Sequence, residues 1–138
     1  MMKCKIEIYR DTTEAKKVLN RVHYGIYNQT SKTLFSVLKS HIAKEKMKSY
    51  KPKYEEDYIS FEEKGSQKVC QDGYNRINNF LLGSADDFKE RPDVSRVLNN
   101  RMVRIILKQI GKLIKGDATV LSMCNSFGIT FKWYIENA

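Results

Sequence analysis

KCKIEIYR, residues 3–10, decides how the two ends of this chain are arranged. Its apolar residues alternate with polar ones, a two-residue period that is typical of a strand with one buried face. The residues expected on the buried face are Cys4, Ile6 and Ile8. GITFKWYI, residues 128–135, alternates in the same way and predicts a second strand. We expect the two strands to pair under the helices, because a two-stranded ribbon is stable only when it packs on something else.

Between the two strands, apolar residues recur mostly at helical spacing. A helix is expected to begin at Asp11 or Thr12, to break at NQTS, residues 28–31, and to be followed by a second helix through Ile42. The further helical patterns are residues 66–82, residues 93–115 and, as a short helix or turn, residues 118–124. The sequence therefore predicts a mainly α fold of four to five helices, with a short β-strand at each terminus as a minor α+β component.

The chain has 138 residues, which suffices for one domain with a substantial core but not for two. We therefore expect residues 1–138 to form a single domain. Residues 44–58, KEKMKSYKPKYEEDY, are highly charged, contain Pro52 and lack an apolar period. They predict a mobile basic loop.

The composition points to a basic protein of a reducing compartment. A formal net charge of +9 favours nucleic acid, acidic lipid or an acidic protein as partner. Three scattered cysteines without CxxC or Cys/His spacing argue against zinc and for free thiols. Neither a signal peptide nor a transmembrane run is visible. We expect a cytoplasmic protein that has no cofactor and no membrane partner.

RMVRIILKQIGKLIKGD, residues 101–117, holds the clearest candidate binding surface. Its basic residues stand at steps of 3, 4, 4 and 3, which places them in one helical stripe roughly 80° wide. They are Arg101, Arg104, Lys108, Lys112 and Lys115. Asp93 is the expected N-cap of this helix, and Gly116 is the expected residue after its end. A solvated face usually mixes charges of both signs, so five cations without an acid favour an anion supplied from outside.

A second candidate surface mixes cations with aromatic residues. In KMKSYKPKY, residues 46–54, lysines that could neutralise phosphates alternate with tyrosines that could stack on unpaired bases. These residues are Lys46, Lys48, Lys51, Lys53, Tyr50 and Tyr54, and Arg21 opens a similar stretch at residues 21–32. The structural alternative stays open: the tyrosines would cap a half-buried core while the lysines keep the loop soluble.

Catalysis has little support in the residues. His23 and His41 fall on different predicted helices, and a single histidine at helical spacing is more often a packed or surface residue than a base. The adjacent acids at residues 55–57 and 86–87 are typical of solvated or capping positions. No nucleophile elbow, metalloprotease helix or phosphate-binding glycine loop is visible. We therefore expect a protein that is not an enzyme and binds no metal.

Residues 3–45 resemble the N-terminal segment of transposon-encoded RNA-guided nucleases and type V CRISPR effectors. A basic strand ends in Ile8-Tyr9, and a helix with Leu19-Asn20-Arg21 and Tyr27-Asn28 follows. In that family such a segment forms the wedge strand and the first recognition helices. Arg10 stands where the family often has a proline, and the nuclease half with its catalytic carboxylates is absent. The resemblance implies a piece that holds nucleic acid without cutting it.

The sequence thus predicts a non-catalytic module that binds RNA, single-stranded DNA or duplex DNA through the phosphate backbone. Such a module would serve as a subunit or accessory of an RNA-guided or mobile-element complex. The alternative is a small phage-type inhibitor or an adaptor, in which the basic stripe meets an acidic protein and Trp133 and Tyr134 anchor the contact.

Overall fold

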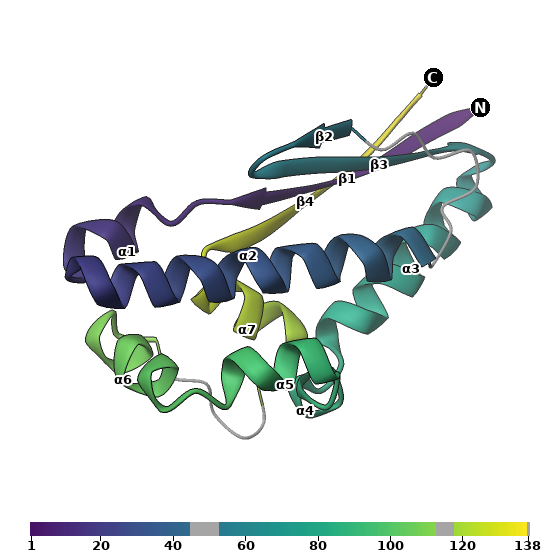
Figure 1. Ribbon diagram of the computed structural model, residues 1–138. Coiled ribbons are helices and arrows are strands. Elements are labelled where there is room, and N and C mark those ends of the chain that lie inside the picture. Colours follow the sequence, from purple (N-terminus) through teal and green to yellow (C-terminus); the bar gives the residue numbers. More distant parts are fainter. Residues whose placement is uncertain (45–52, 113–117, 138) are drawn as a thin grey trace.

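The computed structural model describes residues 1–44, 53–112 and 118–137, and it shows a mixed α+β fold (Figure 1). The strands are β1 (Met2–Arg10), β2 (Lys53–Glu55), β3 (Tyr58–Gly65) and β4 (Ile129–Asn137). The helices in these ranges are α1 (Thr13–Val18), α2 (Arg21–Lys44), α3 (Gln67–Leu82), α4 (Ala85–Lys89), α5 (Pro92–Leu98), α6 (Arg101–Gln109) and α7 (Val120–Ser126). The prediction of a largely helical chain with a strand at each end is confirmed. The predicted number of helices is wrong, and the sheet is larger than two terminal strands.

The two terminal strands do pair. β1 and β4 are antiparallel from Met2 opposite Asn137 to Arg10 opposite Ile129. β3 pairs with the other side of β1, and the short β2 pairs with β3, so the antiparallel sheet has the order β2-β3-β1-β4. The predicted inward residues of β1 are all buried; they are Cys4, Ile6 and Ile8. Taken in groups, the elements follow the order β-α-β-β-α-β, which is the split βαβ arrangement.

The predicted loop at residues 44–58 ends inside this sheet. Lys53–Glu55 form β2, and Tyr58 begins β3, while residues 45–52 lie outside the described part of the chain. β3 escapes sequence reasoning because its inward positions include a charged residue, Glu63, which is fully buried beside Arg76. The Arg76 Nη2 atom lies 3.8 Å from the Glu63 Oε2 atom, so the buried carboxylate faces an opposite charge.

The predicted break at residues 28–31 is also wrong, since α2 runs through it without interruption. The hydroxyl of Thr30 donates to the Ile26 carbonyl at 2.9 Å, and the hydroxyl of Ser31 donates to the Phe127 carbonyl at 2.7 Å. Because both hydroxyls have acceptors inside the fold, they can be buried in the helix without leaving an unsatisfied hydrogen-bond donor. The chain breaks earlier, at Leu19-Asn20, where the Asn20 side chain accepts from the His23 backbone N–H.

The predicted helix at residues 93–115 is divided into α5 and α6 at Asn99-Asn100. Asn100 caps α6 by accepting from the Met102 backbone N–H at 2.9 Å. Pro92, not the predicted cap Asp93, is the first residue of α5. α6 ends at Gln109, and Gly111 just after it has φ +71°, so the predicted end at Gly116 is not the end of this helix.

The elements form layers with the sheet at one side of the molecule (Figure 1). α2 and α3 lie under the sheet, and α4, α5 and α6 lie beyond α2. The apolar core fills the space between these layers. No helix of the described residues lies on the other face of the sheet, so α6 and this open face lie on opposite sides (Figure 1).

Candidate nucleic-acid interface

α6 presents three of the predicted cations on its exposed side. Arg101, Arg104 and Lys108 are all exposed, and Lys112 is exposed just after the helix ends. Because the helix stops at Gln109, the regular stripe covers three cations instead of five. Lys115, the last predicted member of the stripe, lies outside the described residues.

The opposite side of α6 fixes its orientation. Val103, Ile106 and Leu107 are buried against the core, as their helical spacing predicts. His23 of α2 lies beside the end of α6, with its Nδ1 atom 3.0 Å from the Gln109 side-chain oxygen. With one side buried and the other in water, the cations of α6 have to face outward.

The cations of α6 have no acidic partner in the described part of the chain. Within residues 1–44, 53–112 and 118–137, none of Arg101, Arg104, Lys108 and Lys112 forms an ion pair. The first turn of α6 contains no acidic residue either. A helix N-terminus carries partial positive charge from its free backbone N–H groups, so the cation Arg101 at this end adds to a positive field. This region of the surface therefore gathers positive charge without an acidic side chain in the first turn of the helix.

A groove of about 410 Å³ runs along the same helix. Arg104 and Lys108 of α6 line one side of it, and Ser95 and Asn99 supply polar side chains from α5 and its end. Lys89 of α4 joins them, although its Nζ atom also lies 3.7 Å from an Asp86 carboxylate oxygen. Among the described residues, no acidic side chain lines the groove. Three cations and two neutral polar groups suit phosphate oxygens, which accept hydrogen bonds and carry negative charge.

Of the remaining predicted site residues, the structure describes only some. Arg21 is exposed at the first position of α2, two residues before the His23 contact to α6. The predicted loop residues Lys46, Lys48, Tyr50 and Lys51 lie outside the described residues. The backbones of Lys53 and Tyr54 belong to β2, but the description does not extend to their side chains.

Sequence reasoning missed a cluster on the open face of the sheet. Glu7 of β1 is only 7% exposed although it lies on the face opposite the buried Ile6 and Ile8. The phenol of Tyr9 donates to its Oε2 atom at 2.9 Å, and the phenol of Tyr58 donates to the same atom. Tyr134 approaches from β4 on the same face. The alternation of β1 places Glu7 and Tyr9 together, but only the pairing of distant strands adds the other two tyrosines.

The Tyr–Glu cluster holds a carboxylate and phenols in defined protonation states. Burial opposes ionisation of Glu7, but the hydrogen bonds from Tyr58, Tyr9 and Tyr134, with Lys5 nearby, keep its pKa below the ordinary value. The hydrogen bond to Glu7 raises the pKa of Tyr9 to about 12. A charged carboxylate and neutral phenols are therefore the stable combination at neutral pH.

The charges of the open sheet face are balanced, in contrast to those of α6. Lys3 lies 3.9 Å from Glu62 and 3.6 Å from Glu136, and Lys5 and Lys132 lie over tyrosine rings. These contacts satisfy the lysines within the chain. The open face is therefore a weaker candidate for phosphate binding than α6.

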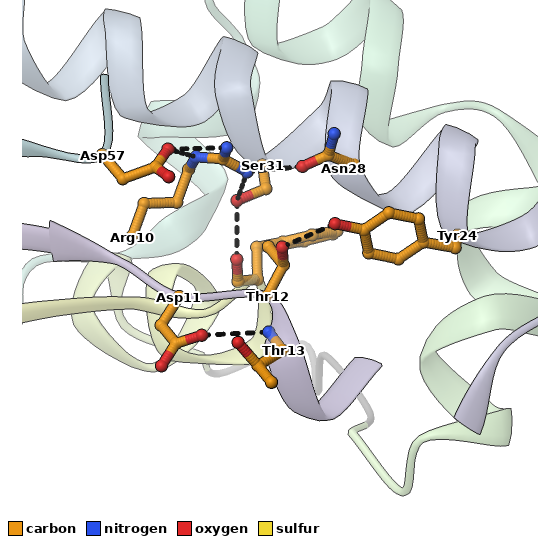
Figure 2. A network of polar contacts seen from close by, with 9 residues as sticks. Arg10, Asp11, Thr12, Thr13, Tyr24, Asn28, Ser31 and Asp57 are labelled. Carbon is orange, nitrogen blue, oxygen red and sulfur yellow. Dashed lines mark hydrogen bonds and ion pairs between the residues drawn. The ribbon is translucent and has the colours of Figure 1, made fainter. Parts of the chain in front are cut away.

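Arg10 is a structural residue instead of a binding cation (Figure 2). Its guanidinium is buried, contacts Asp57 through Nη2 at 2.7 Å and donates to Asn28 through Nη1 at 2.7 Å. Nearby, the hydroxyls of Thr12 and Tyr24 are hydrogen-bonded at 3.0 Å (Figure 2). The network joins the end of β1 to α2 and to the turn before β3.

The histidines do not form a catalytic arrangement with one another. His23 contacts Gln109, and the His41 ring stacks on Phe80 with 3.6 Å between ring centroids. No group of three metal-ligating side chains occurs among the residues that the structure describes. In the same residues, no helix is both long and apolar enough to cross a membrane.

Comparison with known proteins found no match among family models, curated proteins or solved structures.

Proposed function

We propose that this chain is a non-catalytic nucleic-acid-binding module that holds the phosphate backbone of RNA or DNA against α6. The observation that carries the proposal is the exposed row of Arg101, Arg104, Lys108 and Lys112, which has no acidic partner in the described residues. Each such cation releases condensed counterions when it neutralises a phosphate, and this release drives binding.

The spacing of the row supports contact with several phosphates. Arg101 and Lys108 are seven residues apart on one helix, which corresponds to about 10 Å along its axis. Both side chains are long and exposed, and the groove beside Arg104 and Lys108 offers polar groups to the same backbone. Contacts of this kind position a nucleic acid without reading its sequence.

The same chemistry fits a subunit of an RNA-guided or mobile-element complex, which would hold nucleic acid without cleaving it. The three buried free cysteines are consistent with a reducing cytoplasm. In the alternative, the row of cations binds an acidic protein, as it would in a phage-type inhibitor or an adaptor.

Binding of the purified chain to fluorescent single-stranded and double-stranded RNA and DNA, titrated at several salt concentrations, tests the proposal. We expect binding to all sequences of one strand type with similar affinity and a steep dependence on salt. Weak binding to every nucleic acid, even at low salt, would refute the proposal. Capture of one acidic protein from the native host would then identify the alternative.

A further inference from the structure

β4 is a long edge strand that no bulge interrupts. It forms one end of the sheet and runs for nine residues, whereas β2 at the other end has three. β4 contains neither proline nor glycine, and among the described residues no other strand pairs with its outer edge. An edge of this length presents a row of free backbone donors and acceptors, which makes it a template for another strand.

The second half of β4 also exposes large side chains. Ile129 at its start is completely buried, but Tyr134 is 40% exposed and Ile135 is 42% exposed. Beside this half lies a cleft of about 190 Å³, lined by Phe131 and Trp133 of β4 and by Tyr74 of α3. A strand docked on the edge would cover the exposed residues and bring apolar side chains to the cleft.

We propose that the occupant of this edge is a second copy of the chain, paired antiparallel through β4 about a two-fold axis at Tyr134. In this register, Lys132 of each copy lies opposite Glu136 of the other, and Trp133 lies opposite Ile135. Because of the two-fold axis, each of these two pairs occurs twice in the dimer. Cross-strand pairs of opposite charge and pairs of aromatic with β-branched residues both stabilise antiparallel strands.

Other registers lose this complementarity. Moving the axis to Lys132 sets two lysines directly opposite each other, which is unfavourable. Moving it to Trp133 sets Glu136 opposite Thr130 and leaves no pair of opposite charges. In the proposed register, Glu136 lies between Lys3 of its own chain, at 3.6 Å, and Lys132 of the second copy. Its side chain is 61% exposed and is therefore accessible to this second cation.

Complementary charge variants test the register. Lys132→Glu alone and Glu136→Lys alone each place like charges opposite one another twice, so each variant should raise the dimer dissociation constant by about tenfold or more. When the two variants are mixed, both pairs become attractive again. Sedimentation equilibrium should then show twice the chain mass in the mixture and lower mass for each variant alone, and circular dichroism verifies that each variant folds.

Cross-linking provides a second test that changes no charge. Tyr134→Cys would bring two thiols to directly opposite positions, where Cα atoms about 4.5–5.5 Å apart allow a disulfide. Diamide, which accepts the two electrons and two protons, should cross-link this variant rapidly. Ile105→Cys is the matched control, since Ile105 is 45% exposed and belongs to α6, which lies apart from β4 (Figure 1). A wild-type monomer over the whole concentration range, or a dimer that persists in both charge variants, would overturn the proposal.

Discussion

Replacing Arg104 and Lys108 together by glutamine should flatten the salt dependence of nucleic-acid binding. Both side chains line the groove along α6, and neither forms an ion pair in the described residues. Glutamine keeps most of the length of each side chain but removes its charge. Because both positions are exposed on the helix, the folded state should lose less than about 0.5 kcal/mol.

The size of the effect follows from counting phosphates. If Arg101, Arg104, Lys108 and Lys112 each neutralise one phosphate of duplex DNA, the slope of log K against log salt is about −3.6. Removing two cations brings it to about −1.8. Between 50 and 200 mM salt, the affinity of the variant would then fall about 12-fold, whereas that of the wild type would fall about 150-fold. The difference of about 1.8 between the slopes does not depend on how many other cations contribute.

Fluorescence anisotropy with a labelled duplex and a labelled single strand measures both slopes. The matched control is Lys64→Gln with Lys68→Gln, which removes the same charge from exposed positions on β3 and α3. These positions lie at the opposite end of the molecule from α6 (Figure 1). If the control flattens the slope as much as the α6 variant does, overall charge and not the α6 surface governs binding. If neither variant changes the slope, the α6 cations do not contact phosphates. Either result refutes the reasoning.

Four further substitutions test the fold by urea denaturation. Gly128→Ala should lower the free energy of unfolding by about 3 kcal/mol, because Gly128 has φ +79° and a Cβ atom there would lie 2.3 Å from the Asp11 carbonyl oxygen. Gly25→Ala should instead raise it by about 0.5–1 kcal/mol, because Gly25 lies inside α2 and nothing lies within 4 Å of an added Cβ atom. Equal effects of the two alanines would contradict this account. Arg10→Gln should lower the free energy of unfolding by about 2 kcal/mol, a value between those for exposed and buried ion pairs. The Arg10 side chain is buried, whereas its partner Asp57 is half exposed. An unchanged free energy of unfolding would mean that the Arg10 network is not structural. The pKa of Glu7 is lower in the folded state than its unfolded value near 4.5, so its ionisation stabilises the fold above pH 4.5 and stops doing so as the pH falls through the folded pKa. Glu7→Gln should therefore be less stable than wild type at neutral pH, and its stability should depend less on acid. Parallel pH profiles of variant and wild type would argue against the Tyr–Glu cluster.

The parts of the fold that could be predicted are those in which one periodic pattern controls burial. Cys4, Ile6 and Ile8 are the inward residues of β1, and the sheet buries all three. β3 could not be found in this way, because Glu63 occupies an inward position and is stabilised by Arg76, a residue of another element. A pattern of hydrophobicity along the chain does not contain such a partner.

The candidate site shows the same division. The burial of Val103 and Leu107 and the exposure of Arg104 follow from a period of 3.6 residues, so one side of α6 could be predicted. The length of α6 could not be predicted. Asn100 caps its start and Gly111 follows its end, although the apolar spacing in the sequence continues beyond both. The Tyr–Glu cluster depends on the register of three strands, and register is set by the whole sheet.

Dimerisation through β4 would change how the α6 surface works. A two-fold axis perpendicular to the sheet keeps every residue on its own face, so the helical layers of both copies, with their two α6 helices, lie on the same side of the extended sheet. A nucleic acid long enough to reach both helices would meet twice the number of cations, and its salt slope should be about double that of a short one. The charge variant Lys132→Glu should abolish this dependence on length while leaving the slope for the short ligand nearly unchanged, and mixing it with Glu136→Lys should restore it. A length dependence that survives in Lys132→Glu alone would show that the two α6 surfaces are not joined through β4.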